Sequence, residues 1–168
     1  VPNDKSGVMV TRDLDSGAPH ILSVAVNEGV GGAVEGQSAE SLRIDTRDGS
    51  VRLLAMATAP WRRNLVPGGG IEKIPASGSG TVLHPAEIRQ LITFAGKLPQ
   101  RLPSIQDEAG KPAPADVEFG FLDGKLQLFQ IRPFLESRRA RGSRYLQRMD
   151  STLGATLSQT VDLRKVPQ

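Results

Sequence analysis

The segment 116–133 constrains the fold most strongly, because two alternating stretches flank Asp123-Gly124, a pair typical of a tight hairpin turn. Carboxylates alternate with apolar residues before this turn, and an amide and a guanidinium alternate with apolar residues after it. Successive side chains of a strand point to opposite faces, so the pattern predicts a β-hairpin with one polar and one apolar face. The four polar residues are Asp116, Glu118, Gln130 and Arg132.

The register of this hairpin decides whether its polar side chains act together. A regular ladder around a two-residue turn would place Glu118 and Gln130 on opposite faces of the sheet. A three-residue loop over 122–124 would instead place Asp116 opposite Gln130. Glu118 would then lie one diagonal step away, and Arg132 would share their face. We therefore predict an odd-length loop or a bulge, with a buried face made of Val117, Phe119, Phe121, Phe129 and Ile131.

The residue types on the polar face suggest two kinds of ligand. Carboxylate and amide oxygens are hard ligands that suit Mg²⁺, so Glu118 and Gln130 are candidate metal ligands. The planar guanidinium of Arg132 suits a phosphate group. The spacing alone leaves open an ordinary solvent-exposed face, on which a surface ion pair contributes only ~0–1 kcal/mol.

The composition favours one globular domain, with or without a tail. The chain has 168 residues, of which 38% are hydrophobic and 18 are glycine, so disorder throughout is not expected. The absence of cysteine excludes disulfides, thiolate metal sites and a cysteine nucleophile, and it fits a reducing compartment; we expect a cytoplasmic protein. No apolar run approaches the ~20 residues that span a bilayer, so we expect no membrane partner.

Short strands with one long helix and no regular strand–helix alternation predict an α+β fold with a mostly antiparallel sheet. The clearest helix begins at Pro85, and its apolar face consists of Ile88, Leu91, Ile92 and Ala95. We interpret 60–80 as a mobile loop around one strand, in which Trp61 anchors the chain, although Trp61-Arg62-Arg63 would also suit stacking on a base. The predicted strands before the hairpin cover 7–11, 21–26, 42–45, 51–56 and 71–75.

The net charge of +3 is concentrated near the C-terminus, where residues 136–148 contain five arginines and one glutamate. We expect one domain over 1–136 and a basic C-terminal tail or linker over 137–168. The pattern in this tail is compatible with a helix from about Gly142 to Met149. Because the chain begins almost inside a predicted strand, we expect it to be a fragment of a longer protein.

Three stretches resemble motifs of a single family. Residues 6–13, followed by Ser16-Gly17, resemble its "SGVMFTRDP…TG", and the glycine-rich residues 29–36 resemble "GLGEAVVSG". Residues 114–133 resemble "PQDIEWA…DGKLYILQSRP". Residues 6–136 thus resemble the C-terminal subdomain of the ATP-grasp nucleotide-binding domain of the phosphoenolpyruvate synthase and pyruvate phosphate dikinase family, which rifampin phosphotransferases share.

The resemblance implies roles for five residues and two cofactors, ATP and Mg²⁺. Glu118 and Gln130 would bind Mg²⁺ on the nucleotide phosphates. Arg132 would be the catalytic residue, because it would hold a phosphate through charge-assisted hydrogen bonds. Asp116 would support this site, and Arg12 of the first motif would contribute to nucleotide binding.

The resemblance also implies what else the reaction needs. The family phosphorylates a histidine on a separate swivelling domain and then passes the phosphate to pyruvate or another acceptor. Its N-terminal phosphate-gripping lysine and arginine and its phosphohistidine motif have no counterpart here, and we interpret His20 and His84 as structural. We therefore expect a parent ATP-dependent phosphotransferase, with an isolated chain that is inactive. Its expected partners are a nucleotide, the missing N-terminal subdomain and a phosphohistidine domain.

Two other interpretations stay open. Gly32 stands where the family has a glutamate, which favours a degenerate ATP-grasp module with a structural or regulatory role. The arginines of 138–148 would suit a segment that binds nucleic acid or protein, but only Tyr145 interleaves with them, so nucleic acid is not the expected partner. The glycines at 68–70 and 78–80 are not followed by the Lys-Ser/Thr of a phosphate-binding P-loop.

Overall fold

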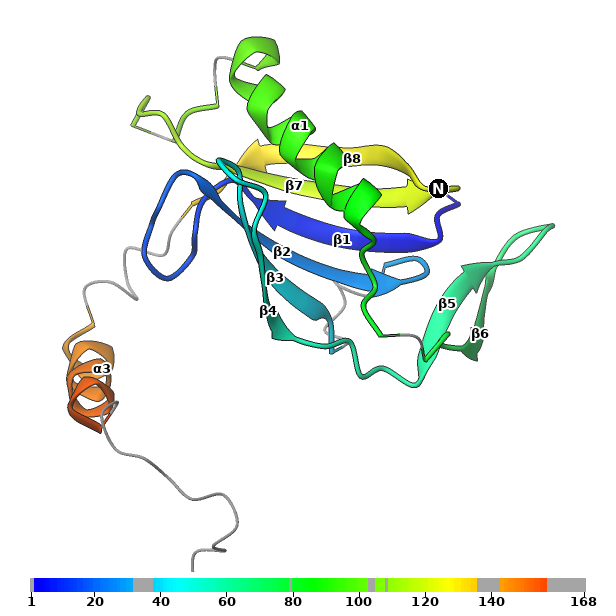
Figure 1. Cartoon of the computed structure of the whole chain (residues 1–168), viewed down its shortest axis with the longest axis horizontal. Helices are drawn as coiled ribbons and strands as arrows, with labels where there is room; N and C mark the ends of the chain where they lie inside the picture. Colours follow the sequence, from blue (N-terminus) through cyan, green and yellow to red (C-terminus); the bar gives the residue numbers. More distant parts are fainter. Residues whose placement is uncertain are drawn as a thin grey trace, which may run out of the picture. The chain divides into compact units, whose positions relative to one another are not determined.

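The computed structural model describes residues 2–31, 38–78, 80–102, 105–107, 109–135 and 143–156. Contacts within the chain divide it into two compact units, Val1–Phe134 and Leu135–Gln168. The first unit contains a six-stranded antiparallel sheet in the order β4-β3-β2-β1-β7-β8, a second sheet of β5 and β6, and one long helix, α1 (Figure 1). The fold is therefore of the α+β class, with a mainly antiparallel sheet and one main helix, as the sequence predicts.

The first unit has six strands before the helix α1 and two strands after it. Their bounds are β1 Lys5–Val10, β2 Ile21–Glu28, β3 Glu40–Asp45, β4 Val51–Ala55, β5 Trp61–Leu65, β6 Ile71–Pro75, α1 Pro85–Arg101, β7 Ala115–Leu122 and β8 Lys125–Pro133.

The region 60–80 differs from the sequence-based interpretation. Trp61–Leu65 is not part of a loop but a strand, β5, which pairs with β6 along its whole length. The turn between them is closed by hydrogen bonds from Val66 N to Gly70 O and from Gly69 N to Val66 O. The three glycines at 68–70 all have positive φ, so they serve this turn.

α1 lies across one face of the six-stranded sheet and completes the core (Figure 1). Its N-terminus is capped by Glu87, whose Oε2 accepts the His84 N–H at 2.8 Å and also lies 2.6 Å from Lys5 Nζ. Leu91 of the predicted apolar face is fully buried, and Ile88, Ile92 and Ala95 pack against the core. The buried core residues are Met9, Leu22, Val24, Val26, Leu42, Ile44, Val82, Leu83, Leu91, Leu98, Ala115, Val117, Phe119 and Phe121.

A buried carboxylate ties the segment before α1 to the sheet. Glu40, at the start of β3, is 0% exposed. Its two oxygens accept the backbone N–H groups of Val82 at 2.7 Å and of Leu83 at 3.0 Å. Both N–H groups would otherwise be buried without an acceptor, so Glu40 offsets their desolvation.

The second unit contains helix α3, Arg144–Thr156, where the sequence is compatible with a shorter helix. Tyr145 on this helix is 71% exposed. Within the described part of the chain, no helix combines the length and apolar character needed to cross a membrane.

Candidate functional site

The polar face of the C-terminal hairpin brings its carboxylates next to its amide and its guanidinium. Glu118 of β7 lies directly opposite Gln130 of β8, and Asp116 lies directly opposite Arg132. The sequence predicts Asp116 opposite Gln130, so the observed register differs by two residues along β8. The difference places the two candidate metal ligands directly opposite each other rather than diagonally.

The hairpin reaches this register with a two-residue turn and a bulge. Leu122 pairs with Lys125 around Asp123-Gly124, so the predicted three-residue loop is wrong. Both turn residues have positive φ, 51° and 69°, which matches the twist of the flanking strands. The register shifts between Glu118 and Phe119, and the predicted bulge is therefore confirmed. The two-residue turn alone would have separated the polar side chains.

Phe129 is the extra residue of this bulge, and it does not lie where the sequence predicted. It was expected on the buried face with Phe119, but its side chain is 40% exposed. A Cβ added at Gly120 would lie 2.7 Å from Phe129 Cζ. Gly120 alternates with the two buried phenylalanines of β7, so the ring of Phe129 covers the opposite, polar face. Val117, Phe119 and Phe121 are fully buried as predicted, and Ile131 packs against the core.

Arg132 is held on one side by the two carboxylates of β7. Its Nε donates to Asp116 Oδ2 at 2.8 Å, and its Nη2 lies 3.6 Å from Glu118 Oε1. The hydrogen bond to Asp116, the charge of Asp116 and then that of Glu118 raise the pKa of Arg132 further above its ordinary value. Since half of the Arg132 side chain is exposed, the arrangement orients a guanidinium that solvent still reaches.

Glu118 and Gln130 fit a magnesium ion that is also bound by phosphates. Directly opposed residues of an antiparallel pair have Cβ atoms ~4.5–5.5 Å apart, so their side-chain oxygens can converge on one cation. Mg²⁺ is commonly held by one or two protein oxygens together with water and substrate phosphates. Among the residues that the structure describes, no group of three or more His, Cys, Asp and Glu side chains could hold a metal ion. A cation at this site would therefore need ligands from a bound molecule.

Arg12 lies at the same end of the sheet as Arg132. Val10, the last residue of β1, pairs with Asp116, which in turn pairs with Arg132. Arg12 follows Val10 by two residues and is half-buried. The register thus places this candidate nucleotide-binding residue at the same end of the strands as Arg132.

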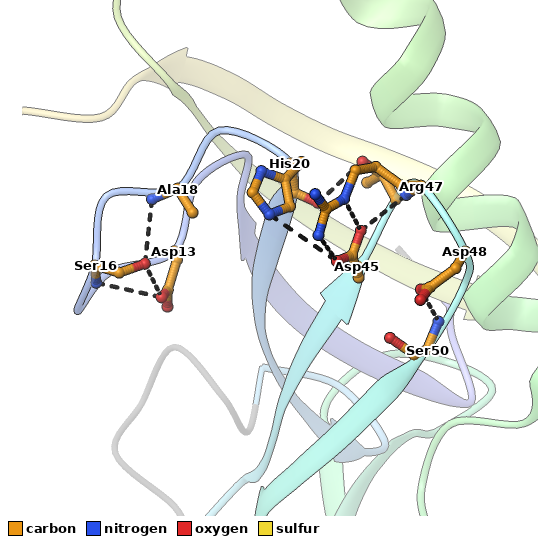
Figure 2. Close-up of polar contacts among 9 residues, drawn as sticks. Asp13, Ser16, Ala18, His20, Asp45, Arg47, Asp48 and Ser50 are labelled. Carbon is orange, nitrogen blue, oxygen red and sulfur yellow. Dashed lines mark hydrogen bonds and ion pairs between the residues drawn. The ribbon is translucent and has the colours of Figure 1, made fainter.

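The segment after Arg12 forms a tight turn around Asp13. The Asp13 carboxylate accepts hydrogen bonds from the Ser16 hydroxyl and backbone N–H (Figure 2), and its Oδ1 lies 2.8 Å from Arg43 Nε. The hydrogen bond from the Ser16 side chain, more than the charge of Arg43, lowers the pKa of Asp13. In this motif, Asp13 and Ser16 stabilise the turn.

Arg43 was not among the residues singled out from the sequence, although it shares the face and the row of the candidate site. It pairs with Ser23, which pairs with Val10, and Asp116 and Arg132 continue the row. Asp13 and Asp15 both form ion pairs with Arg43. The alternation of Leu42-Arg43-Ile44, with both apolar neighbours buried, is the sequence signal that places Arg43 on this face.

The two histidines lie within the described residues, whereas the glycine-rich loop and the basic segment do so only in part. His84 precedes α1, and the His20 ring lies beside Asp45, with 4.0 Å between Nε2 and Oδ2 (Figure 2). Most of the glycine-rich loop, residues 32–37, lies outside the described residues. So do residues 136–142 of the basic segment.

No protein-family model matches this chain, and no curated protein matches it. The assignment of the site therefore depends on its own geometry.

Proposed function

We propose that this chain is the ATP- and Mg²⁺-binding C-terminal subdomain of an ATP-grasp phosphotransferase. The observation that carries the proposal is the direct opposition of Glu118 and Gln130, with Arg132 on the same face. These residues supply two oxygen ligands for a cation and one guanidinium for a phosphate. Phosphoryl transfer depends mainly on positioning and on neutralising charge, and this set of side chains does both.

Each residue has a distinct role in this proposal. Glu118 and Gln130 hold Mg²⁺, which neutralises charge on the nucleotide phosphates. Arg132 binds a phosphate through its Nη groups. Asp116 is a positioning residue, because its hydrogen bond to Arg132 Nε fixes the guanidinium without occupying both Nη groups. Arg12 contributes a second positive charge at the same end of the sheet.

The chain would supply one wall of the nucleotide site. A second subdomain would supply the facing wall, and a histidine on another domain would receive the phosphate before the final acceptor. The isolated chain would therefore bind nucleotide without turning it over. The absence of cysteine supports a cytoplasmic parent protein.

The experiment that tests the proposal is a calorimetric titration of the chain with ATP, with and without Mg²⁺. We expect binding of about millimolar strength, corresponding to ~4 kcal/mol, that requires Mg²⁺. Arg132→Ala should abolish it. Arg89→Ala, which removes an exposed arginine from α1 on the apolar side of the sheet, is the matched control and should bind like the wild type. Binding that ignores Mg²⁺, or that both substitutions leave unchanged, would contradict the proposal.

A further inference from the structure

A buried amide group near the end of β2 has no hydrogen-bond partner. Asn27 is only 2% exposed, and within the described part of the chain its side-chain nitrogen Nδ2 donates to no acceptor. Most buried polar groups in proteins are hydrogen-bonded, because a buried donor that lacks an acceptor costs free energy. The unpaired amide of Asn27 therefore points to an acceptor that the chain itself does not supply.

Asn27 lines a cavity of about 310 Å³. The wall of this cavity is formed by the end of β2, the segment that joins β4 to β5, and the segment that follows β6. Cavities that bind small molecules typically measure ~300–1,000 Å³, so this one suits a compact ligand. Most of its described lining residues are small or apolar, and the polar ones are Asn27, Glu28 and Thr58.

The charges around the cavity do not suit a phosphate group. Glu28 is the one charged residue among the described residues that line it, and none of these is a lysine or an arginine. The Glu28 carboxylate accepts hydrogen bonds from the Ser77 hydroxyl and from its backbone N–H, the latter at 2.9 Å, and lies 3.7 Å from Arg62 Nη1. These contacts occupy and neutralise the carboxylate, so the cavity favours a neutral ligand.

An aromatic ring and a thioether form the apolar part of the wall. Trp61 does not anchor a loop, because its side chain is 52% exposed at the start of β5, and Met56 is 50% exposed. Both residues line this cavity. Aromatic rings pack favourably against a tryptophan ring and against a methionine sulfur. A flat aromatic ligand would therefore cover apolar surface that is now in contact with water.

The wall is held in place by contacts within the chain. Ala76 N donates to Pro60 O at 3.0 Å, and Thr58 N donates to Ser38 O at 3.4 Å. Trp61 pairs with Pro75 across the β5–β6 hairpin. A cavity that is formed before the ligand arrives requires less ordering on binding, which lowers the entropic cost.

A water molecule alone fits this cavity less well than an organic ligand. A buried water typically makes about three hydrogen bonds to polar groups of the protein. Here Asn27 and Thr58 are the polar lining residues that remain once the Glu28 carboxylate is bound by Ser77. A ligand with one acceptor and an apolar body matches one unpaired donor in a mainly apolar wall.

We propose that this cavity binds a small, neutral aromatic molecule that carries a carbonyl group. The carbonyl oxygen accepts a hydrogen bond from Asn27 Nδ2, and the ring packs against Trp61 and Met56. This inference does not rest on the proposed ATP site, because it uses neither Mg²⁺ nor Arg132. Asn27 pairs with Ser6, whereas Glu118 pairs with Val8, so the two sites also lie at different levels of the sheet.

The test is an NMR titration of the whole chain with acetophenone, a neutral aromatic ketone. Trp61 is the only tryptophan, so its indole N–H gives a single signal. Acetophenone should shift both this signal and the side-chain NH₂ signals of Asn27. α-Methylstyrene, which has a CH₂ group in place of the carbonyl oxygen, should shift the signal of Trp61 only. Unchanged Asn27 signals with acetophenone would overturn the inference, because water would then be the only partner of this amide.

A substitution measures the hydrogen bond independently of the hydrophobicity of the two ligands. In Asn27→Leu, the ratio of acetophenone affinity to α-methylstyrene affinity should fall by about tenfold relative to the wild type, because the donor is lost. Asn64→Leu is the matched control, since it makes the same change at an exposed position of β5 and should leave the ratio unchanged. A ratio that Asn27→Leu leaves unchanged would contradict the proposed hydrogen bond.

Two further measurements separate this cavity from the proposed ATP site. Arg132→Ala should leave the shifts caused by acetophenone unchanged, so a failure at one site is distinguishable from a failure at the other. AMP without Mg²⁺ should shift neither the Asn27 nor the Trp61 signals, because no described lining residue offers a positive charge to its phosphate. Shifts caused by AMP would overturn the assignment to a neutral ligand.

Discussion

Glu118 and Gln130 face each other across β7 and β8 because Phe129 is an extra residue in β8. The two-residue turn at Asp123-Gly124 would otherwise send the side chains of Glu118 and Gln130 to opposite faces of the sheet. The bulge lies directly beside the Glu118–Gln130 pair, and it returns these two side chains to the same face of the sheet. Bulges commonly occur beside functional residues, where they change the direction of a side chain.

Deleting Phe129 should preserve the pairing of Glu118 with Gln130. Without the extra residue, Leu128 still pairs with Phe119 and the next position is Gln130 itself, so the ladder becomes regular. Deleting Gln130 is the matched control, because it also shortens β8 by one residue but removes the ligand. Calorimetry should therefore show Mg²⁺-dependent ATP binding in the first deletion variant and none in the second. The opposite ranking would show that Phe129 itself, rather than the register, supports the site.

Gly120→Ala should destabilise the protein by about 1–3 kcal/mol, because the new methyl group has no room. A Cβ there would lie 2.7 Å from Phe129 Cζ and 2.9 Å from Lys5 O, and the second of these atoms belongs to the backbone. Gly96→Ala in α1 is the matched control, since no atom outside the local helix backbone lies within 4 Å of its added Cβ. That variant should be more stable by about 0.5–1 kcal/mol. Urea unfolding measures the change in the free energy of unfolding of each variant. Equal changes in the two variants would contradict the packing described at Gly120.

Glu40→Gln should cost about 1–3 kcal/mol of stability, even though it removes a buried charge. The carboxylate accepts one N–H with each oxygen, whereas an amide offers only one acceptor and places its own NH₂ against the second N–H. Glu72→Gln, on the exposed β6, should change the free energy of unfolding by less than about 0.5 kcal/mol. A stable Glu40→Gln variant would mean that the segment before α1 is not held by this carboxylate.

The Asp45 carboxylate should stabilise the protein only above acidic pH. The hydrogen bond from the Arg47 side chain is the largest cause that lowers the pKa of Asp45 from 3.8 to about 2, and the Arg47 backbone N–H adds to it. A carboxylate whose pKa is lower in the folded state than in the unfolded state stabilises the protein. This contribution is complete at a pH above the pKa of the unfolded state, and it is lost as the pH falls through the pKa of the folded state. Urea unfolding of Asp45→Asn and wild type should therefore differ near neutral pH and converge as the pH falls from 3.8 towards about 2.

Arg47→Gln supplies the partner measurement. This substitution removes the side-chain group that donates to Asp45. In Arg47→Gln, adding Asp45→Asn should therefore change the pH dependence of the free energy of unfolding much less than it does in the wild type. A difference that stays constant with pH, or that grows in acid, would contradict the assignment to this pair.

The sequence predicted features that depend on local pattern. Alternation and Asp123-Gly124 predicted the hairpin, and Pro85 with its apolar spacing predicted α1. The sequence could not decide between a longer turn and a bulge, because both correct the alternation. The structure has the bulge, and the ring of Phe129 lies over Gly120.

Two further features depend on residues that are distant in the sequence. Trp61-Arg62-Arg63-Asn64-Leu65 has no apolar alternation, so β5 was visible only through its pairing with β6. Glu40 resembles a surface residue until the N–H groups of Val82 and Leu83 are placed against it.

The central claim is that Glu118 and Gln130 hold one cation on a bound nucleotide, and paramagnetic NMR tests it most directly. Mn²⁺ replaces Mg²⁺ with similar oxygen ligands, and it broadens the signals of nearby amides even when binding is weak. Adding Mn²⁺ with ATP should broaden the amides of 116–118 and 130–132 first, and Glu118→Ala should remove the effect. Broadening that is absent, or that Glu118→Ala leaves unchanged, would contradict the account.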